Sequence, residues 1–193
     1  MDEKDIIKLE NIGVTDSKLL SEKQRELISE EIKKIADYKI IKVEPWEIDE
    51  AVEGKDGLNL NWLEARKIAE IINELNPDIA YIDCPSPNIK SYSDYLSKLL
   101  KKPIKLVVEH KSDFKYTVVG AASILAKVIR EEEIKKIEEK IGESVGTGYP
   151  SNPICQEFLK RNWDKYPNIF RKSWISWKNH KIAKEQKRIE DFE

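Results

Sequence analysis

The sequence predicts an α/β fold in which helices pack on a sheet, followed by an all-helical C-terminal part. Strand-like and helix-like patterns alternate over the first two thirds of the chain. Two apolar runs end in acidic residues, as strands of an open sheet often do. After the glycine-containing stretch at 146–150 the pattern is helical and rich in tryptophan.

The individual elements follow from periodicity and from start and stop signals. Ser21 and Gln24 form a capping-box pair at the start of the first helix pattern. Asn76-Pro77 ends the second helix pattern, and Ser151 is a suitable N-cap for the helix after the glycine stretch. The patterns predict helices over residues 21–36, 61–75, 92–100 and 121–141, and strands over residues 38–43, 78–83 and 104–109.

Length and composition restrict the class of protein. A chain of 193 residues is long enough to bury its own core, and it favours one folding domain. Its 40% hydrophobic and 36% charged residues exclude a membrane protein and argue against wholesale disorder. No apolar run approaches a bilayer span, and no secretory signal opens the chain. Cys84 and Cys155 show no metal-ligand spacing, which favours reduced thiols and a cytoplasmic location.

The charge is distributed unevenly along the chain. Residues 171–190 contain seven basic and two acidic residues, a net +5, whereas the rest of the chain carries −7 of the overall −2. A basic end on an acidic body is typical of a local phosphate-binding surface beside a cation-binding centre. The alternative interpretation is a solvated helix face without a partner.

Two aspartates point to a metal site. Asp83 ends the apolar run 78–83, and Asp113 follows the run 104–109 after a short connection. The carboxyl ends of neighbouring strands meet at one edge of an α/β sheet, where such folds place their chemistry. Two carboxylates that lie close together repel each other unless a cation neutralises them. The sequence therefore predicts a cation at Asp83 and Asp113.

Further candidate residues are weak when each is taken alone. Tyr149, between the glycines and prolines of residues 146–153, could present its ring to a sugar or base, although an ordinary loop is the simpler interpretation. Lys127 and Lys18 could contact phosphates or could simply be solvated. Tryptophans interleaved with basic residues at 160–178 suit nucleic acid, but they are also common in cores and interfaces.

Together and in this order, these segments resemble ribonuclease HII, the type 2 ribonuclease H family, and especially its archaeal members. The resemblance covers the chain from about Gly13 to Trp177. It rests on Asp-Ser-Lys-Leu-Leu at 16–20, Asn-Leu-Asn-Trp-Leu-Glu-Ala at 59–65, Tyr-Ile-Asp at 81–83, His-Lys-Ser-Asp at 110–113, Ala-Ala-Ser-Ile-Leu-Ala-Lys at 121–127, Gly-Thr-Gly-Tyr-Pro-Ser-Asn-Pro at 146–153 and Arg-Lys-Ser-Trp at 171–174.

The resemblance implies a ribonuclease H-like fold, with a central mixed sheet flanked by helices and a helical C-terminal extension. Residues 1–145 would form the ribonuclease H-like domain, and residues 146–193 would form a substrate-binding extension. The implied activity is endonucleolytic hydrolysis of the RNA strand of RNA/DNA hybrids, including cleavage at ribonucleotides embedded in duplex DNA. The products would carry 5′-phosphates.

The resemblance also implies a set of site residues. The family binds Mg²⁺ or Mn²⁺ with four carboxylates, and Asp83 and Asp113 match the two later ones. Tyr149 matches the tyrosine that packs on the sugar at the RNA–DNA junction, next to Gly148. Lys18 and Lys127 lie in matching segments and are expected to contact phosphates.

The chain departs from the family pattern at its beginning. The family opens with a strand carrying Asp-Glu-Ala-Gly-Arg-Gly, which supplies the other two carboxylates and reads the ribose 2′-hydroxyl. Here Asp2-Glu3 is followed by Lys4-Asp5, without those glycines or the arginine. The sequence therefore predicts that the first family strands are missing and that this 193-residue form has little or no activity. The alternative is a catalytically dead nucleic-acid-binding remnant of the same family.

The last residues suggest a protein partner. Gln186, Ile189 and Phe192 have the spacing of the short box that docks on replication sliding clamps, although Glu193 stands where a second aromatic residue is usual. A frayed basic helix end is the alternative interpretation, because short motifs often match by chance. The expected partners are thus nucleic acid and the sliding clamp, with no membrane, and the protein is expected to be a monomer.

Overall fold

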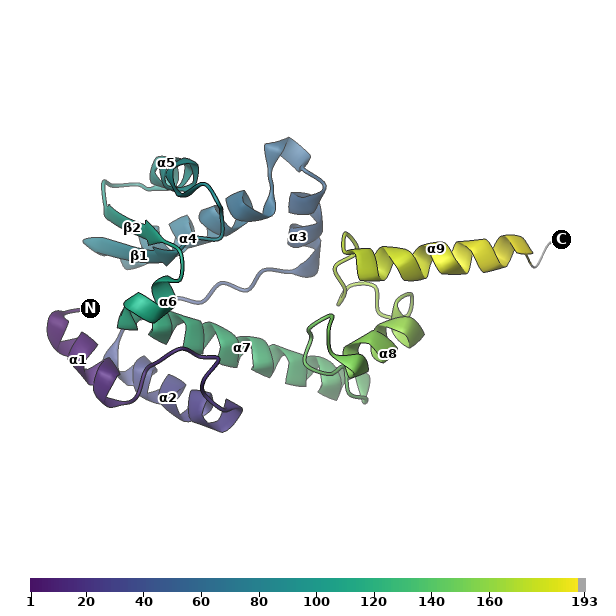
Figure 1. Cartoon of the computed structure of the whole chain (residues 1–193), viewed down its shortest axis with the longest axis horizontal. Coiled ribbons are helices and arrows are strands. Elements are labelled where there is room, and N and C mark those ends of the chain that lie inside the picture. The colour runs from purple at the N-terminus through teal and green to yellow at the C-terminus, as the bar shows by residue number, and fades with distance from the viewer. Residues whose placement is uncertain (191–193) are drawn as a thin grey trace. The chain divides into compact units, whose positions relative to one another are not determined.

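A computed structural model describes the backbone of residues 1–190 and the side chains of residues 1–182 except Glu3 and Lys55 (Figure 1). The described chain divides into two compact units. Unit 1 contains residues 1–41 and 61–130, and unit 2 contains residues 42–60 and 131 onward. Within the described residues, none of the helices combines the length and the apolar composition that a membrane crossing requires.

A small parallel sheet organises one half of unit 1. Strand β1 (Ile79–Asp83) pairs with β2 (Lys105–Glu109), with Ile79 opposite Lys105 and Asp83 opposite Glu109. Helix α5 (Ile89–Leu99) makes the crossover between the two strands that parallel pairing requires, and α4 (Leu60–Leu75) precedes them (Figure 1).

The core around this sheet follows from the alternation of side chains along β1. Ala80 and Ile82 are buried, whereas the neighbouring positions face outward. The buried positions pack with one face of α4 and one face of α5, namely Ala65, Ala69, Ile72, Tyr92 and Leu96. Packing against α4 and α5 therefore determines which face of the sheet is buried. The same packing holds the end of each strand in place.

Three helices form the second core of unit 1. These are α1 (Glu3–Asn11), α2 (Glu22–Ile35) and the first part of α7 (Thr117–Ile141). Leu9 and Ile32 pack with residues of α7, and the capping box of Ser21 and Gln24 at the start of α2 is confirmed. This packing holds residues 12–20 against α7, because those residues join α1 to α2.

Unit 2 contains helices and one short 3₁₀ turn. Its elements are α3 (Pro45–Val52), η1 (Lys55–Gly57), the second part of α7, α8 (Pro153–Asn162) and α9 (Ile175–Glu190). Phe158 is fully buried beside Tyr166 and Phe170. The indole N–H of Trp177 donates to the carbonyl of Trp163 at 3.3 Å, which ties α9 to the end of α8.

The predicted α/β class and helical C-terminal part are confirmed, but several elements differ. The strand predicted over residues 38–43 is wrong, because this segment joins no ladder within the described chain and is irregular. A strand needs a neighbour to receive its hydrogen bonds, and apolar character alone does not supply one. The sequence also missed α1 and α3, and the N-cap of α8 is Asn152 rather than Ser151.

Candidate metal and nucleic-acid site

Asp83 lies at the predicted position, the carboxyl end of β1. Its side chain is on the outward-facing side of the alternating strand, opposite Glu109 at the end of β2. Parallel strands deliver their carboxyl ends to one edge, which is where α/β sheets bind ligands. An exposed carboxylate at this edge can therefore be reached by a cation or by a phosphate-bound ion.

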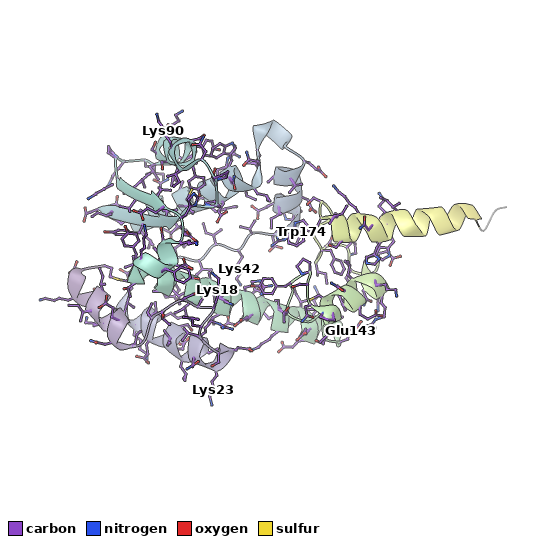
Figure 2. The ribbon with its side chains drawn as sticks, in the orientation of Figure 1. Lys18, Lys23, Lys42, Lys90, Glu143 and Trp174 are labelled. Atoms are coloured by element: carbon purple, nitrogen blue, oxygen red, sulfur yellow. The ribbon has the colours of Figure 1, made fainter. Side chains whose placement is uncertain are left out.

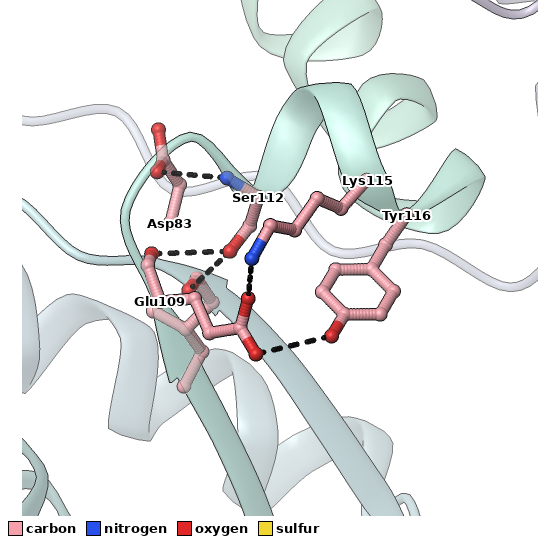
Figure 3. Close-up of polar contacts among 6 residues, drawn as sticks. Asp83, Glu109, Ser112, Lys115 and Tyr116 are labelled. Atoms are coloured by element: carbon pink, nitrogen blue, oxygen red, sulfur yellow. Dashed lines mark hydrogen bonds and ion pairs between the residues drawn. The ribbon is translucent and has the colours of Figure 1, made fainter.

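Ser112 links Asp83 to the segment that carries Asp113. The backbone N–H of Ser112 donates to Oδ1 of Asp83 at 3.2 Å (Figure 3). The Ser112 hydroxyl lies 3.1 Å from both the carbonyl oxygen of Ile82 and that of Glu109, so one proton is shared between the ends of the two strands. Because Ser112 is fully buried, this contact fixes the short helix α6 (Ser112–Lys115) on the strand ends.

Asp113 is thereby brought to the same edge as Asp83. Its side chain is only 12% exposed, and Lys18 Nζ lies 3.7 Å from its Oδ2. The same ammonium group stands 5.6 Å from the centre of the Phe114 ring. The basic group of the Asp16-Ser17-Lys18 segment thus faces one of the two predicted carboxylates. Asp83 and Asp113 with these neighbours are called the Asp83–Asp113 site below.

The 16–18 segment is held on α7 by contacts that the sequence could not show. The hydroxyls of Ser17 and Ser123 lie 3.1 Å apart, and the backbone N–H of Lys18 donates to Asp16 Oδ1 at 3.0 Å. A Cβ at Gly120 would lie 3.5 Å from the carbonyl oxygen of Asp113, so α7 passes close to this site. Lys18, which belongs to the 16–18 segment, is labelled in Figure 2. Three of the segments that carry the family resemblance therefore meet in unit 1.

Lys127 lies on the same helix, one turn beyond Ser123, and is half-buried. Its position on the helix that contacts the 16–18 segment is compatible with a role near the Asp83–Asp113 site. A shared helix does not fix where the ammonium group of a long side chain lies, so the role of Lys127 in phosphate binding stays a prediction.

Two glutamates near the site received no role from the sequence. Burial raises the pKa of Glu64 on α4, and the negative charge of Asp83 raises it further. Glu109 differs, because its carboxylate forms an ion pair with Lys115 and accepts a hydrogen bond from the Tyr116 hydroxyl at 3.3 Å (Figure 3). The hydrogen bond from Lys115 lowers the pKa of Glu109, so this residue stays charged and holds α6 in place.

The signal for Glu64 was present in the sequence. It belongs to the segment at 59–65 that resembles the family, but helix periodicity alone does not reveal that its carboxyl group would feel the charge of Asp83. The nearby Tyr92 hydroxyl is fully buried and has no hydrogen-bond partner among the described atoms. Burial, and then the charge of Glu64, raise the pKa of Tyr92 far above its ordinary value.

The donor chemistry of the site suits a hard divalent cation. Carboxylate oxygens are the preferred ligands of Mg²⁺, which commonly uses one or two carboxylates and keeps several waters or substrate phosphate oxygens. Among the described side chains, no group of three or more acidic, histidine or cysteine residues converges to hold a metal ion. Asp83 and Asp113 are therefore two carboxylates of the kind that such a cation prefers.

The second set of predicted site residues lies in unit 2. The loop before α8 is folded around Cys155, whose sulfur accepts a hydrogen bond from the N–H of Gly148 at 3.0 Å. Asn152 caps α8 by accepting from the N–H of Cys155 at 3.1 Å, and Gly146 has a positive φ of 73°. Tyr149 follows on this loop and is 48% exposed, so its ring is accessible to a ligand.

The predicted clamp-docking residues are described only in part. The backbone of Gln186 and Ile189 is helical, within α9. Their side chains, and Phe192 as a whole, lie outside the described residues.

The chain is similar in sequence to known ribonucleases. The model of the family described as Ribonuclease HII matches residues 1–177. A ribonuclease HII from Methanocella arvoryzae is 40% identical over 177 residues, which span 90% of this chain and 78% of the relative. One from Pyrococcus furiosus is 41% identical over 180 residues, again 90% of this chain and 78% of the relative.

Similar solved structures point to the same family. The ribonuclease H2 from Pyrococcus horikoshii OT3 aligns with a TM-score of 0.84 at 36% identity, covering 95% of this chain and 87% of that one. The ribonuclease HII of a PCNA complex from Archaeoglobus fulgidus aligns with a TM-score of 0.77 at 39% identity, covering 90% and 82%. A ribonuclease HIII in complex with Mn²⁺, 20% identical, shares the fold. The chain belongs to the ribonuclease HII family.

Proposed function

We propose that this protein is an endonuclease that hydrolyses the RNA strand of RNA/DNA hybrids and cuts at ribonucleotides embedded in duplex DNA. Its family is one of ribonucleases H. The observation that carries the proposal for this chain is the Ser112 contact, which joins Asp83 to the segment of Asp113 at the end of the sheet. A pair of carboxylates held in this way is suited to metal-assisted phosphodiester hydrolysis.

We propose that Asp83 and Asp113 ligate divalent cations, Mg²⁺ or Mn²⁺. When bound, two such ions would activate a water and stabilise the leaving 3′-oxygen. The protein's own contribution is to keep both carboxylates at one edge and to keep Asp83 oriented through the Ser112 N–H. The Nζ of Lys18 lies 3.7 Å from Oδ2 of Asp113. Once a cation neutralises this carboxylate, Lys18 would be able to bind a substrate phosphate instead.

Residues of both units would contact the substrate. We propose that residues 1–145 form the catalytic domain and residues 146–193 a substrate-binding extension, in a monomeric protein. Tyr149 would pack on the sugar at the RNA–DNA junction, with Gly148 allowing the backbone to approach, and Lys127 would contact a phosphate. The exposure of Tyr149 and the tight loop around Cys155 support this role.

The proposal is tested by cleavage of a DNA duplex that contains one ribonucleotide, with Mg²⁺ or Mn²⁺. Because Asp83 and Asp113 are two of the four carboxylates that the family resemblance implies, we expect only weak, metal-dependent cleavage by the 193-residue chain. Asp83→Asn is expected to abolish it. Robust cleavage with Mg²⁺ would contradict the expected weakness, and cleavage that survives Asp83→Asn would contradict the assignment of the site.

The same assay separates the enzyme from a non-catalytic binding protein. Binding of the hybrid without any cleavage, with either metal and at high protein concentration, would favour the alternative that the protein is a catalytically dead nucleic-acid-binding member of the family. A chain that neither binds nor cleaves would overturn both proposals. Binding is measured by fluorescence anisotropy of a labelled hybrid without divalent cations, so that no turnover occurs.

A second proposal concerns the sliding clamp. A similar protein, the ribonuclease HII of Archaeoglobus fulgidus, has been solved in complex with PCNA. We propose that residues 186–193 of this chain, with Gln186, Ile189 and Phe192 as anchors, dock on the replication clamp. The test is a pull-down with the clamp using the whole chain and a chain that ends at residue 185. Equal recovery of both would remove the proposal.

A further inference from the structure

Asp49 uses both of its carboxylate oxygens to hold a distant turn within unit 2. Its Oδ2 accepts from the backbone N–H of Lys172 at 3.0 Å. Its Oδ1 accepts from the backbone N–H of Ser173 at 2.9 Å and from the Ser173 hydroxyl at 2.7 Å. One side chain therefore fixes a turn that lies more than 120 residues away in sequence.

This carboxylate is charged and firmly placed. Burial alone would raise the pKa of Asp49, but the hydrogen bonds from Ser173 and Lys172 and the charge of Lys172 together hold it below the ordinary value. Asp49 lies on α3, which begins with Pro45 at its first turn and a capping box formed by Glu44 and Glu47. The turn is therefore fastened to a helix with a well-defined start.

The contacts of Asp49 go to amide groups and a hydroxyl, not to basic head groups. Lys172 and Arg171 are exposed, and the Arg171 guanidinium stacks over the Trp174 ring at 4.5 Å (Figure 2 labels Trp174). The backbone N–H of Trp174 donates to the carbonyl of Arg171 at 3.2 Å, which closes the turn just before α9. The geometry thus fixes the backbone of the turn and leaves its positive charges on the surface.

We propose that Asp49 is a positioning residue for nucleic-acid binding, which sets the 171–174 turn so that Arg171 and Lys172 meet substrate phosphates. The inference rests on the proposed function, because it assumes that the hybrid is the ligand of this surface. It runs against simple electrostatics, since Asp49 is a negative charge beside a binding surface for a polyanion. Its removal should nevertheless weaken binding.

A competing arrangement gives the opposite sign. Two consecutive N–H groups and a hydroxyl also form a small anion-binding nest, and Asp49 could occupy a place that a phosphate would otherwise take. In that case Asp49→Asn would tighten binding of the hybrid. The direction of the change in affinity therefore decides between a residue that builds the surface and one that blocks it.

The experiment uses the 193-residue chain with Asp49→Asn, Asp49→Ala and Ser173→Ala, and with Glu53→Gln as the matched control. Glu53 is the C-cap residue that follows the same helix and is exposed, so Glu53→Gln makes the same change in charge without touching the turn. Ser173→Ala removes only the hydroxyl donor and keeps both backbone hydrogen bonds. Circular dichroism and thermal melting establish that each variant is folded.

Binding is measured by anisotropy of a labelled RNA/DNA hybrid over a range of salt concentrations without divalent cations. We expect Asp49→Asn and Asp49→Ala to weaken binding roughly three- to tenfold. The slope of log affinity against log salt should fall by about 1 to 2, because Arg171 and Lys172 would no longer displace counterions from two phosphates. Ser173→Ala should have a smaller effect, and Glu53→Gln should leave binding unchanged or slightly tighter. A purely structural role would not change the salt slope.

A second measurement does not depend on nucleic acid. Hydrogen exchange of the Lys172 and Ser173 amides should be roughly tenfold faster in Asp49→Asn and unchanged in Glu53→Gln. Unchanged exchange, or affinity in Asp49→Asn that equals or exceeds that of Glu53→Gln, overturns the inference. If the wild-type chain does not bind the hybrid, the proposed function fails and the positioning role fails with it. A failure confined to the Asp49 variants leaves the proposed function standing.

Discussion

At the scale of single residues, the Asp83–Asp113 site and, separately, the loop of Tyr149 depend on side chains that carry no chemistry themselves. The Ser112 hydroxyl joins the ends of the two strands, the hydroxyls of Ser17 and Ser123 lie 3.1 Å apart, and Asn152 caps α8 after the loop of Tyr149. These are short polar side chains that hydrogen-bond to nearby backbone or to each other. Substitution of these side chains should therefore lower the stability of the fold before it lowers activity.

Two glycines should respond in opposite ways to alanine. Gly146 has a φ of 73°, and a Cβ there would lie 2.6 Å from Asn152 Oδ1 and 2.9 Å from Cys155 Sγ. We expect Gly146→Ala to destabilise the fold by about 1–3 kcal/mol. Gly120 lies inside α7, where a Cβ would make only ordinary contacts of 3.4 Å and longer, so Gly120→Ala should be neutral or stabilise by about 0.5–1 kcal/mol.

Thermal denaturation of both variants measures this difference. The pair serves as its own control, since each change adds the same methyl group. A melting temperature of Gly146→Ala equal to that of the wild type would show that the loop has a different conformation in solution.

Glu64 should make stability depend on pH. Burial and the charge of Asp83 raise its pKa, so the folded state binds a proton more tightly than the unfolded state. Stability from this group is therefore present at low pH and is lost as pH rises from its ordinary value through the raised value. Because Glu64 keeps an exposed surface, solvent screens part of the effect.

We expect Glu64→Gln to melt at a higher temperature than the wild type at pH 7 without metal, with the difference vanishing below about pH 4, where the carboxyl is protonated in both states. Glu70→Gln, an exposed change on the same helix, should not show this pH dependence. A Glu64→Gln variant less stable than the wild type at pH 7 would contradict the prediction.

At the scale of elements, the short helix α6 matters out of proportion to its length. It is four residues long and cannot be stable alone, but it is fixed to both strand ends by Ser112 and by the pairing of Glu109 with Lys115. Because Asp113 is part of this helix, the position of the second carboxylate is set by the strand ends rather than by local sequence. The Asp83–Asp113 site therefore keeps its geometry only while the contacts between α6 and the two strand ends persist.

Ser112→Ala should separate the two roles of Ser112. Losing the hydroxyl removes one shared hydrogen bond and should cost about 0.5–1.5 kcal/mol, because the carbonyl of Glu109 still accepts from the N–H of Cys84 at 2.8 Å. The backbone N–H to Asp83 remains, so the rise in melting temperature on adding Mn²⁺ should persist. Asp83→Asn is the comparison, and it should lose most of that rise. Loss of the Mn²⁺ effect in Ser112→Ala would show that the hydroxyl is needed to shape the site.

The irregular segment at 38–43 and the helix α3 illustrate how neighbours decide an element. The β-branched and aromatic residues of the first predict a strand, but within the described residues no strand lies beside it to form a ladder. Helix α3 was missed, although Pro45 is a good first residue of a helix, because an eight-residue apolar pattern is too short to recognise. Local sequence favours an element, and packing with neighbours determines whether it forms.

At the scale of the whole molecule, positive charge is concentrated toward the C-terminal end. Residues 171–190 carry a net +5 on a chain of net −2. Two basic groups of this region lie over aromatic rings, Arg171 over Trp174 at 4.5 Å and Lys181 over Trp177 at 6.0 Å. A protein of overall negative charge can therefore still bind a polyanion through one region.

This asymmetry predicts a local salt effect. Replacing Lys178 and Lys181 by glutamine should lower the salt slope of hybrid binding by about 2, since each phosphate contact releases roughly one counterion. The double change Lys4→Gln and Lys23→Gln alters net charge equally on exposed positions of α1 and α2, and it should leave the slope unchanged. Equal slopes for the two double variants would mean that affinity depends on total charge rather than on this region.

Local sequence patterns were enough to establish the family, the α/β class and the two strands that end at Asp83 and near Asp113, because these depend on periodicity and on ordered motifs. The packed structure was needed to show that Ser112 joins the strand ends, that Lys18 faces Asp113 and that Asp49 holds the turn at Ser173. Each of these contacts spans from about 30 to more than 120 residues. Hydrogen bonds across such separations form only after the cores have packed, so no local pattern contains them.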